Sequence, residues 1–210
     1  MRVLLTNPEV DLLTYYLATW TGDMLKKSKS KSNKYFHLKR EKVTRKKFES
    51  ILKKRSIDLV LLCGHGDSDA VAGTNGVVLD TDNDDLLEGK IVHALSCQSA
   101  KELGPDAIAK GANAYISYKE DFIAFLDDSN QSSKPLKDEI ASLFLNPAFT
   151  APRTLLKGGT PEASVMAAKK AYNQSIKEAL NSDIQSDADQ FINWLLWDRD
   201  NLTLCQKGTQ

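Results

Sequence analysis

Two short apolar runs, each ending at a reactive side chain, most constrain what this chain can fold into. The first, residues 58–66, ends in Gly-His-Gly, and the second, residues 91–100, contains Cys97, thirty-two residues after His65. Runs of this length and composition predict buried strands of a parallel sheet. The carboxyl ends of parallel strands meet at one sheet edge, so neighbouring strands would bring His65 and Cys97 together there.

An imidazole beside a thiol indicates nucleophilic catalysis. A cysteine needs thiolate character to attack a carbonyl carbon, and a nearby histidine takes its proton or forms an ion pair with it. Gly66, without a Cβ, lets the backbone approach a substrate and donate an N–H to the developing oxyanion, and the Cys97 N–H would supply a second donor. The sequence therefore predicts His65 as base, Cys97 as nucleophile, and the Gly66 and Cys97 amides as oxyanion donors.

Three motifs in order, His65-Gly66, residues 96–100 (Ser-Cys-Gln-Ser-Ala) and residues 110–118, resemble the caspase-like (clan CD) cysteine peptidases, which include gingipains, separases, legumains and CHAT domains. The middle motif is most similar to the CHAT pattern. The Gln-Ala-Cys-Arg-Gly type of caspase signature is absent, so a preference for aspartate is not implied. The resemblance covers residues 57–125 well and implies an α/β fold, a caspase-like three-layer sandwich with a mostly parallel central sheet flanked by helices.

The segment 117–121 stands where CHAT- and separase-like sequences carry an aromatic residue followed by acids that line the substrate pocket. An acid in that pocket would favour Arg or Lys before the scissile bond through a charge-assisted pair. Lys119, if turned inward, would favour an acidic residue instead, and the alternative is that all these charges belong to a solvated loop. The candidate substrate-binding residues are Asp121, Glu120, Asp67, Ser96 and Tyr118.

Strand and helix signals alternate along the chain, which predicts parallel pairing through right-handed crossovers. Asn7 is the expected cap of the first helix, with Pro8 at its first position. The 210 residues, 41% of them apolar, fit one domain spanning 1–210. Besides the run from residue 91, strands are predicted at 3–6, 35–38, 57–63, 114–118 and 202–205, a hairpin at 70–83, and helices at 8–27, 45–55, 99–110, 134–145, 161–180 and 189–197.

Composition and cysteine spacing limit the partners and the cellular location that we expect. A formal net charge of zero gives no reason to expect nucleic acid, and the basic stretch 26–55 is interpreted as a solvated face. Three cysteines without a Cys-x-x-Cys spacing argue against a disulfide scaffold and for a reducing compartment. The apolar start is too short for a signal peptide and no run reaches membrane-spanning length, so we expect a cytoplasmic protein without a membrane partner.

The remaining histidines, cysteines and acids have structural interpretations. His93 is expected to be an interior or edge histidine, and Cys63 and Cys205 to be unreactive. The histidine and cysteine spacings match no zinc pattern, and residues 80–85 fail the calcium-loop test because the sixth position is not glycine and the twelfth is Ile91. These acids are expected to form a solvated loop, and no metal or cofactor is predicted.

Together these features predict a cysteine endopeptidase that hydrolyses a protein substrate with a His65/Cys97 dyad. The CHAT-like motif suggests control by a regulatory or sensor protein in a bacterial or archaeal stress or antiviral setting. One alternative is an inactive caspase-like binding or scaffold module. Another is an unrelated doubly wound hydrolase or nucleotide binder, which the lack of a Gly-x-Gly-x-x-Gly or phosphate-loop motif after any strand weakens.

Overall fold

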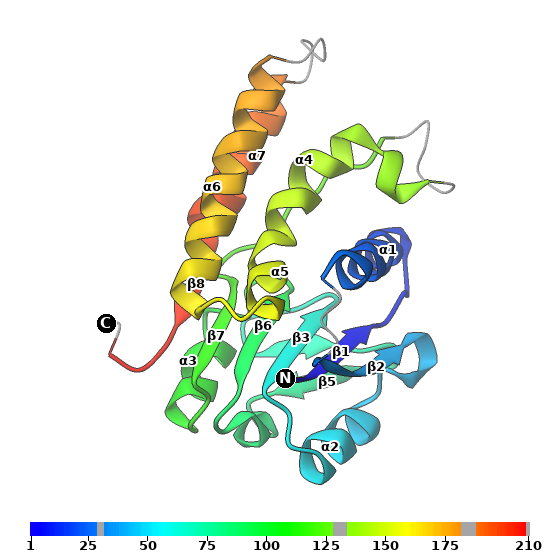
Figure 1. The fold of residues 1–210 in the computed structure, drawn as a ribbon, viewed down its shortest axis with the longest axis vertical. Helices are drawn as coiled ribbons and strands as arrows, with labels where there is room; N and C mark the ends of the chain where they lie inside the picture. The colour runs from blue at the N-terminus through cyan, green and yellow to red at the C-terminus, as the bar shows by residue number, and fades with distance from the viewer. Residues whose placement is uncertain (29–31, 128–133, 182–187, 209–210) are drawn as a thin grey trace.

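A six-stranded sheet forms the centre of the computed structural model, which describes residues 1–28, 32–127, 134–181 and 188–208 (Figure 1). The strand order is β2-β1-β3-β6-β7-β8. The first five strands pair in parallel, and β8 pairs antiparallel with β7 at the edge. The strands are β1 (Arg2–Asn7), β2 (Lys34–Lys39), β3 (Leu59–Cys63), β6 (Ile91–Leu95), β7 (Ala114–Tyr118) and β8 (Leu202–Cys205).

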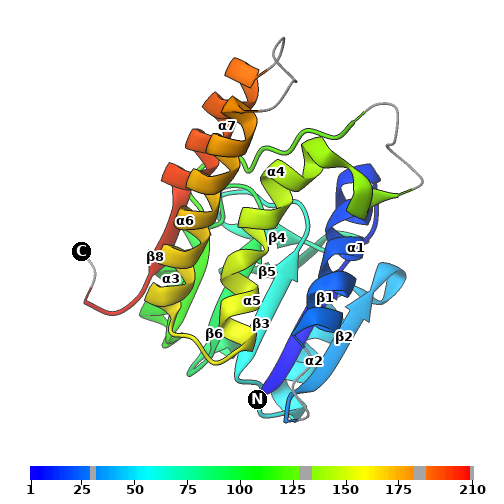
Figure 2. The ribbon, with the colours of Figure 1, turned by 45° about the horizontal axis from the view of Figure 1, so that its top comes forward.

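Helices cover both faces of this sheet, so the predicted three-layer α/β sandwich is confirmed (Figures 1 and 2). One face carries α1 (Leu12–Lys27), α4 (Glu139–Ala148), α5 (Thr150–Leu156), α6 (Pro161–Leu180), α7 (Ala188–Asn201) and the short turn η3 (Pro135–Lys137). The other face carries α2 (Arg45–Lys54), α3 (Leu103–Ala109), the hairpin β4 (Ala70–Ala72) and β5 (Val77–Asp80), and the turns η1 (Arg40–Lys42) and η2 (Asp84–Leu87).

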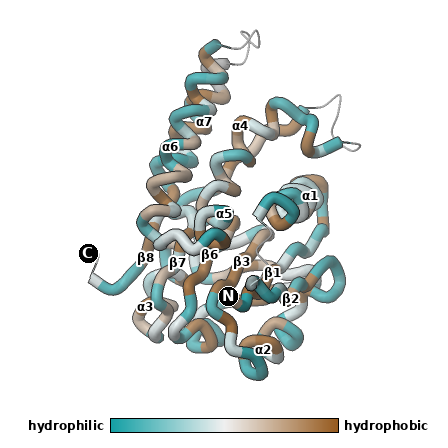
Figure 3. The backbone as a smooth tube through the Cα atoms, viewed as in Figure 1, coloured by the Kyte–Doolittle hydropathy of each residue, from teal (hydrophilic) through white to brown (hydrophobic). Residues whose placement is uncertain are grey.

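The central strands are apolar on both faces because each face packs against its own core. In β1, Leu5 belongs to the core under α1 and α5, and its neighbour Leu4 belongs to the core under α2 and α3. Leu61 and Val60 of β3 divide in the same way. Figure 3 shows this as a hydrophobic centre surrounded by helices with hydrophilic outer faces.

The first helix starts later than the sequence predicts. Asp11, not Asn7, is the N-cap: its side chain accepts a hydrogen bond from the Thr14 amide, and the Thr14 hydroxyl accepts one from the Asp11 amide. Glu9 has a φ of 54°, a left-handed conformation that no helix can continue through. The predicted caps Thr44 of α2 and Thr160 of α6 are confirmed.

Two other helices differ from prediction. The segment predicted to be helical from residue 99 becomes helical only at Leu103, because the Glu102 and Leu103 amides donate to the Ser68 carbonyl across the fold. Helix α5 was not predicted; prolines at 147 and 152 obscure the helical period of α4 and α5. No helix within the described ranges is both long and apolar enough to cross a membrane.

Candidate active site

The two motifs that carry the candidate chemistry follow neighbouring strands. In the register of β3 and β6, Cys63 stands opposite Leu95. The pairing continues one residue further, because the Gly64 amide donates to the Leu95 carbonyl at 3.3 Å. His65 is the residue after Gly64, and Cys97 is the second residue after Leu95. Both therefore lie at the carboxyl edge of the sheet, where ligands of open α/β sheets bind.

Gly66 makes the closest contact between the two motifs. A Cβ at Gly66 would lie 2.7 Å from the Cys97 carbonyl oxygen and 2.9 Å from the Ser96 Cβ, closer than real Cβ atoms approach. Only a residue without a side chain fits here without moving the backbone. The His65-Gly66 backbone therefore lies directly against Ser96-Cys97.

Two backbone amides at this contact are unengaged. Among the described residues, neither the Gly66 N–H nor the Cys97 N–H has a hydrogen-bond partner, although the flanking Asp67 and Gln98 amides donate to Ala70 and Glu120 carbonyls. Unpaired donors at the carboxyl edge of a sheet can receive an anionic oxygen. These are the two amides that the sequence predicts as oxyanion donors.

The His65 imidazole pairs with Asp11, a residue that sequence reasoning did not single out. The Nε2 atom of His65 contacts Oδ2 of Asp11 in a short hydrogen bond, and both side chains are about half exposed. Asp11 reaches this position because it caps α1, directly after the loop that follows β1. The sequence signal was present in the Asp-Leu-Leu-Thr start of the helix, which reads as a cap with its partner three residues on.

The Asp11 contact fixes which imidazole nitrogen can act as a base. Partial burial acts to raise the pKa of Asp11, but the hydrogen bonds from the Thr14 amide and from His65 outweigh it and hold the pKa below its usual value. An ionised carboxylate only accepts hydrogen bonds, so Nε2 of His65 must donate. The lone pair of the neutral ring is then on Nδ1, which is left to take a proton.

The Cys97 thiol has acidic neighbours. Burial is the main cause that raises its pKa; the Phe122 amide lowers it, and the Asp121 and Asp198 carboxyls raise it further. Within the part of the chain that the structure describes, no hydrogen bond joins Cys97 to His65. The two side chains therefore share the sheet edge but are engaged with different partners.

The structure separates the predicted acidic substrate contacts. Asp121 is exposed, and its Oδ1 accepts a hydrogen bond of 2.9 Å from Gln98, the residue after the nucleophile. Glu120 instead pairs with Lys101 at 2.8 Å. Asp67 is exposed and bonds the Ser68 amide. Lys119 lies in an open groove between α3 and β8.

Two other predicted substrate contacts are corrected. Tyr118 is fully buried, and its hydroxyl pairs with that of Tyr172 at 2.8 Å, so its side chain belongs to the core. Ser96 is also buried and bonds the Ser99 hydroxyl at 2.9 Å, which in turn contacts the Ser117 hydroxyl at 2.7 Å. The alternation of side chains along a strand predicts which face a residue is on, but not whether that face lines an open pocket or packs in the interior. Tyr118 and Ser96 both pack in the interior.

Helix α7 contributes two further residues near the thiol. Trp197 donates its indole N–H to the Asp121 carbonyl at 2.9 Å, and buried Asp198 accepts a hydrogen bond from the Ile123 amide at 3.0 Å. Burial also raises the pKa of Asp198 well above its usual value. The predicted helix ended at Trp197, and no local pattern points from these residues to the cysteine.

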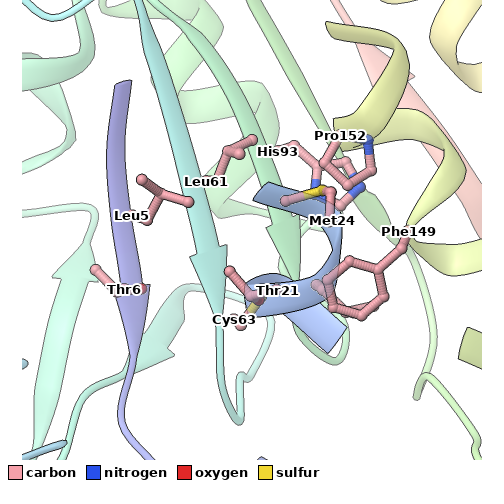
Figure 4. Close-up of a pocket in the computed structure, with 10 residues that line it drawn as sticks. Leu5, Thr6, Thr21, Met24, Leu61, Cys63, His93, Phe149 and Pro152 are labelled. Carbon is pink, nitrogen blue, oxygen red and sulfur yellow. The ribbon is translucent and has the colours of Figure 1, made fainter. Parts of the chain in front are cut away.

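The interior interpretation of His93 is confirmed. His93 is buried and lines a small cavity with Cys63, Met24 and Phe149 (Figure 4). Burial lowers the pKa of His93 to about 4, and its Nε2 has no hydrogen-bond partner among the described residues. Burial raises the pKa of Cys63 to about 11, which fits an unreactive thiol.

The acidic stretch 80–85 differs from the solvated loop that was expected. Asp80 forms a bidentate ion pair with the guanidinium of Arg45 in α2, with one N–O distance of 2.7 Å. Asp84 is fully buried and bonds the Lys110 amine at 2.8 Å. Asp80 therefore connects α2 to the hairpin, and Asp84 of η2 connects this turn to the end of α3.

The parallel sheet between two helical layers, with histidine and cysteine motifs at adjoining strand ends, is a caspase-like fold. No family model and no curated protein matches the sequence. Solved structures with a similar fold include the Arg-specific cysteine proteinase gingipain R (TM-score 0.55, 13% identity) and the complex of Porphyromonas gingivalis RgpB pro- and mature domains (TM-score 0.56, 10% identity). Each match covers 97% of this chain but only 45% and 46% of the neighbour. The likeness shows the fold; no match supports the CHAT or separase comparison.

Proposed function

We propose that this chain is a cysteine endopeptidase in which Cys97 is the nucleophile and His65 the base. The main observation in support of this proposal is the contact of Gly66 with Ser96-Cys97. Because of this contact, the two motifs and two unengaged amides lie at one sheet edge. The gingipain-like fold supports the same class of activity. Asp11 supports His65 as a base by holding the ring through Nε2.

Each step of the proposed hydrolysis has a group to perform it. Nδ1 of His65 takes the Cys97 proton, and the thiolate attacks the peptide carbonyl carbon while the Gly66 and Cys97 amides stabilise the oxyanion. The C–N bond breaks, and the leaving amine takes the proton from the imidazolium. His65 then takes a proton from water, and the hydroxide adds to the thioester carbonyl carbon. The C–S bond breaks, the acid product is released, and the imidazolium returns its proton to the Cys97 sulfur.

A basic residue before the scissile bond fits the exposed charge at the site. Asp121 is exposed and is bonded to the residue after Cys97, so a substrate guanidinium or ammonium group can pair with it. Glu120 already forms an ion pair with Lys101, which makes it a weaker candidate for this role. The solved gingipain R is described as Arg specific, which agrees with this preference.

Control by a regulatory protein, in a cytoplasmic prokaryotic defence setting, is part of the proposal. It is supported by the burial of the thiol and by its acidic neighbours, which raise its pKa and do not favour the reactive thiolate. The alternative of an inactive scaffold draws on the same observation. Covalent labelling of Cys97 by a peptide probe only after a protein partner is added would favour control, and absence of labelling in all conditions would favour the scaffold.

The deciding experiment is cleavage of a peptide panel that places Arg, Lys, Asp or Leu before the scissile bond. We expect the Arg and Lys peptides to be cut and the Cys97→Ala variant to cut none. Equal cleavage by both proteins would refute the assignment of the nucleophile. Cleavage of the Leu or Asp peptides alone would keep the nucleophile and refute the role of Asp121.

A further inference from the structure

Helix α7 is bonded at three places to the segment that follows β7. The Asn201 carbonyl accepts a hydrogen bond from the Lys119 amide at 3.0 Å. The Trp197 indole donates to the Asp121 carbonyl at 2.9 Å, and the Asp198 carboxyl accepts from the Ile123 amide at 3.0 Å. Residues 119–123, which we call the thiol segment, are therefore held in place by α7.

The thiol segment in turn contacts the loop that carries the nucleophile. The Gln98 amide donates to the Glu120 carbonyl at 3.2 Å, and the Gln98 side chain donates to the Asp121 carboxyl at 2.9 Å. Gln98 has a φ of 55°, an uncommon conformation for a residue with a side chain. These contacts hold the backbone on the carboxyl side of Cys97 against the thiol segment.

The two side chains that α7 directs at this segment differ in burial. Asp198 is completely buried, and one of its oxygens has no hydrogen-bond partner among the described residues. An acid in such a place is costly, and its one described bond goes to the thiol segment. Trp197 is 39% exposed, so the contact that fixes Asp121 lies at the surface.

We propose that Trp197 and Asp198 are positioning residues for the nucleophile: they hold the thiol segment so that Cys97 rests beside Asp121 and Phe122 instead of pairing with His65. The inference rests on the proposed role of Cys97. Displacement of α7 is then the step that frees the thiol segment and lets the thiol turn toward the imidazole.

The test is the rate at which iodoacetamide alkylates Cys97 in the full chain, measured against pH and followed for each cysteine by mass spectrometry. The charged groups around the thiol are Asp121 of the segment, Asp198 of α7 and the His65/Asp11 pair across the site. In Trp197→Phe the ring stays and the bond to Asp121 is lost. We expect about three- to tenfold faster alkylation near neutral pH, with the midpoint of the profile moved to lower pH.

Trp194→Phe is the matched control, because it changes the neighbouring ring, whose centroid lies 6.0 Å from that of Trp197, without touching the Asp121 bond. Its profile should equal that of the wild type. An unchanged Trp197→Phe profile, or an equal shift in both variants, would overturn the proposal. Buried Cys63 monitors folding, since it is alkylated only if the core opens.

Asp198 gives an independent test should Trp197→Phe expose Cys63. Asp198→Asn keeps an oxygen to accept the Ile123 amide and removes only the carboxyl that raises the pKa of Cys97, so its shift measures that charge alone. Asp198→Ala also loses the bond to Ile123 and should shift the profile further, as Trp197→Phe is expected to. Equal profiles for Asn and Ala, with Cys63 protected, would refute the role of Asp198. Alkylation needs no peptide cleavage, so these results stay separate from success or failure of the proposed peptidase activity.

Discussion

The two sides of the candidate site are built in different ways. The histidine side is held by Asp11, which is brought to it by the pairing of β1 with β3, two central strands of the sheet. The cysteine side is held by the thiol segment, whose position depends on α7, some hundred residues after Cys97. The proposed base is thus held by a helix cap that directly follows a central strand, and the proposed nucleophile by a helix that is distant in the sequence.

This difference has a consequence for control. Central parallel strands are buried on both faces and cannot move without loss of the core. Helix packing on a sheet can shift by small amounts, and Figure 2 shows α6 and α7 extending as a pair beyond the sheet. We therefore propose that the regulatory partner, if the proposed control exists, acts on the cysteine side.

The largest effect is expected at the cysteine side from Cys97→Ala. Removal of the nucleophile should lower kcat/KM on a basic peptide by about 10³-fold or more. The measurement is peptide hydrolysis at saturating and limiting substrate. Cys205→Ser on β8 serves as the control and should leave the rate unchanged; a comparable loss there would point to a general requirement for thiols.

Gly66→Ala tests the contact at which both sides meet. The added methyl would lie 2.7 Å from the Cys97 carbonyl oxygen, so the backbone must shift and the two oxyanion amides with it. We expect a fall in kcat of about 10²- to 10³-fold, the usual cost of losing an oxyanion donor. Gly22→Ala, where nothing lies within 4 Å of the new Cβ, is the matched control. Full activity of Gly66→Ala would remove the proposed oxyanion site.

Asp11→Asn tests the histidine side alone. Asparagine caps a helix as well as aspartate, so α1 should stay intact, but an amide does not favour the imidazolium that forms during the reaction. We expect kcat to fall about 10- to 10²-fold with little change in KM, less than for a buried triad acid because Asp11 is half exposed. Asp69→Asn, at an exposed acid a few residues after His65 in the sequence, controls for general charge effects. Equal rates for both variants would rule out a positioning role for Asp11.

His93 offers the smallest effect, on stability. Its pKa is about 4 in the fold because burial disfavours the charged ring, against about 6.5 in an unfolded chain. Below pH 6.5 the unfolded state binds a proton that the folded state does not, so the free energy of unfolding falls as the pH drops from 6.5 to 4. The expected slope is about 1.4 kcal/mol per pH unit, a tenfold change in the folding equilibrium.

Denaturant titrations of wild type and His93→Leu at pH 7, 6 and 5 isolate this contribution. The free energy of unfolding of wild type minus that of His93→Leu should fall by about 1.4 kcal/mol for each pH unit below 6.5. His37, whose pKa burial also lowers to about 4, contributes equally to both proteins and cancels. A difference that is independent of pH would show that His93 accepts a proton in the folded state.

Most of the fold could be predicted from the sequence because its strands carry their own signals. The runs ending at Cys63 and at Leu95, and the strand from Ala114 to Tyr118, are apolar on both faces and end at glycine or polar residues. The adjacency of the histidine and cysteine motifs followed from strand order alone. Asp11 was missed because Asn7 and Pro8 also read as a helix start, and only the tertiary contact distinguishes them.

The cysteine side could not be predicted in the same way. The hydrogen bonds of Trp197 and Asp198 span 76 and 75 residues. They join a helix to an irregular segment, so no periodic sequence pattern predicts them. Tyr118 and Ser96 were placed in a pocket because their motif positions matched, yet side-chain burial decided otherwise. Sequence patterns specify faces of elements, whereas pockets depend on what packs over those faces.

The position of α7 and β8 in the chain also bears on how the protein is made. Cys97 leaves the ribosome about a hundred residues before Trp197 and Asp198 do, so the nascent chain exposes its thiol while the helix that positions it has not been synthesised. Translation at roughly 5–20 residues per second makes this interval several seconds long. Under the proposal above, the nascent chain therefore passes through an interval in which chaperones or oxidants can reach a cysteine that the complete fold restrains.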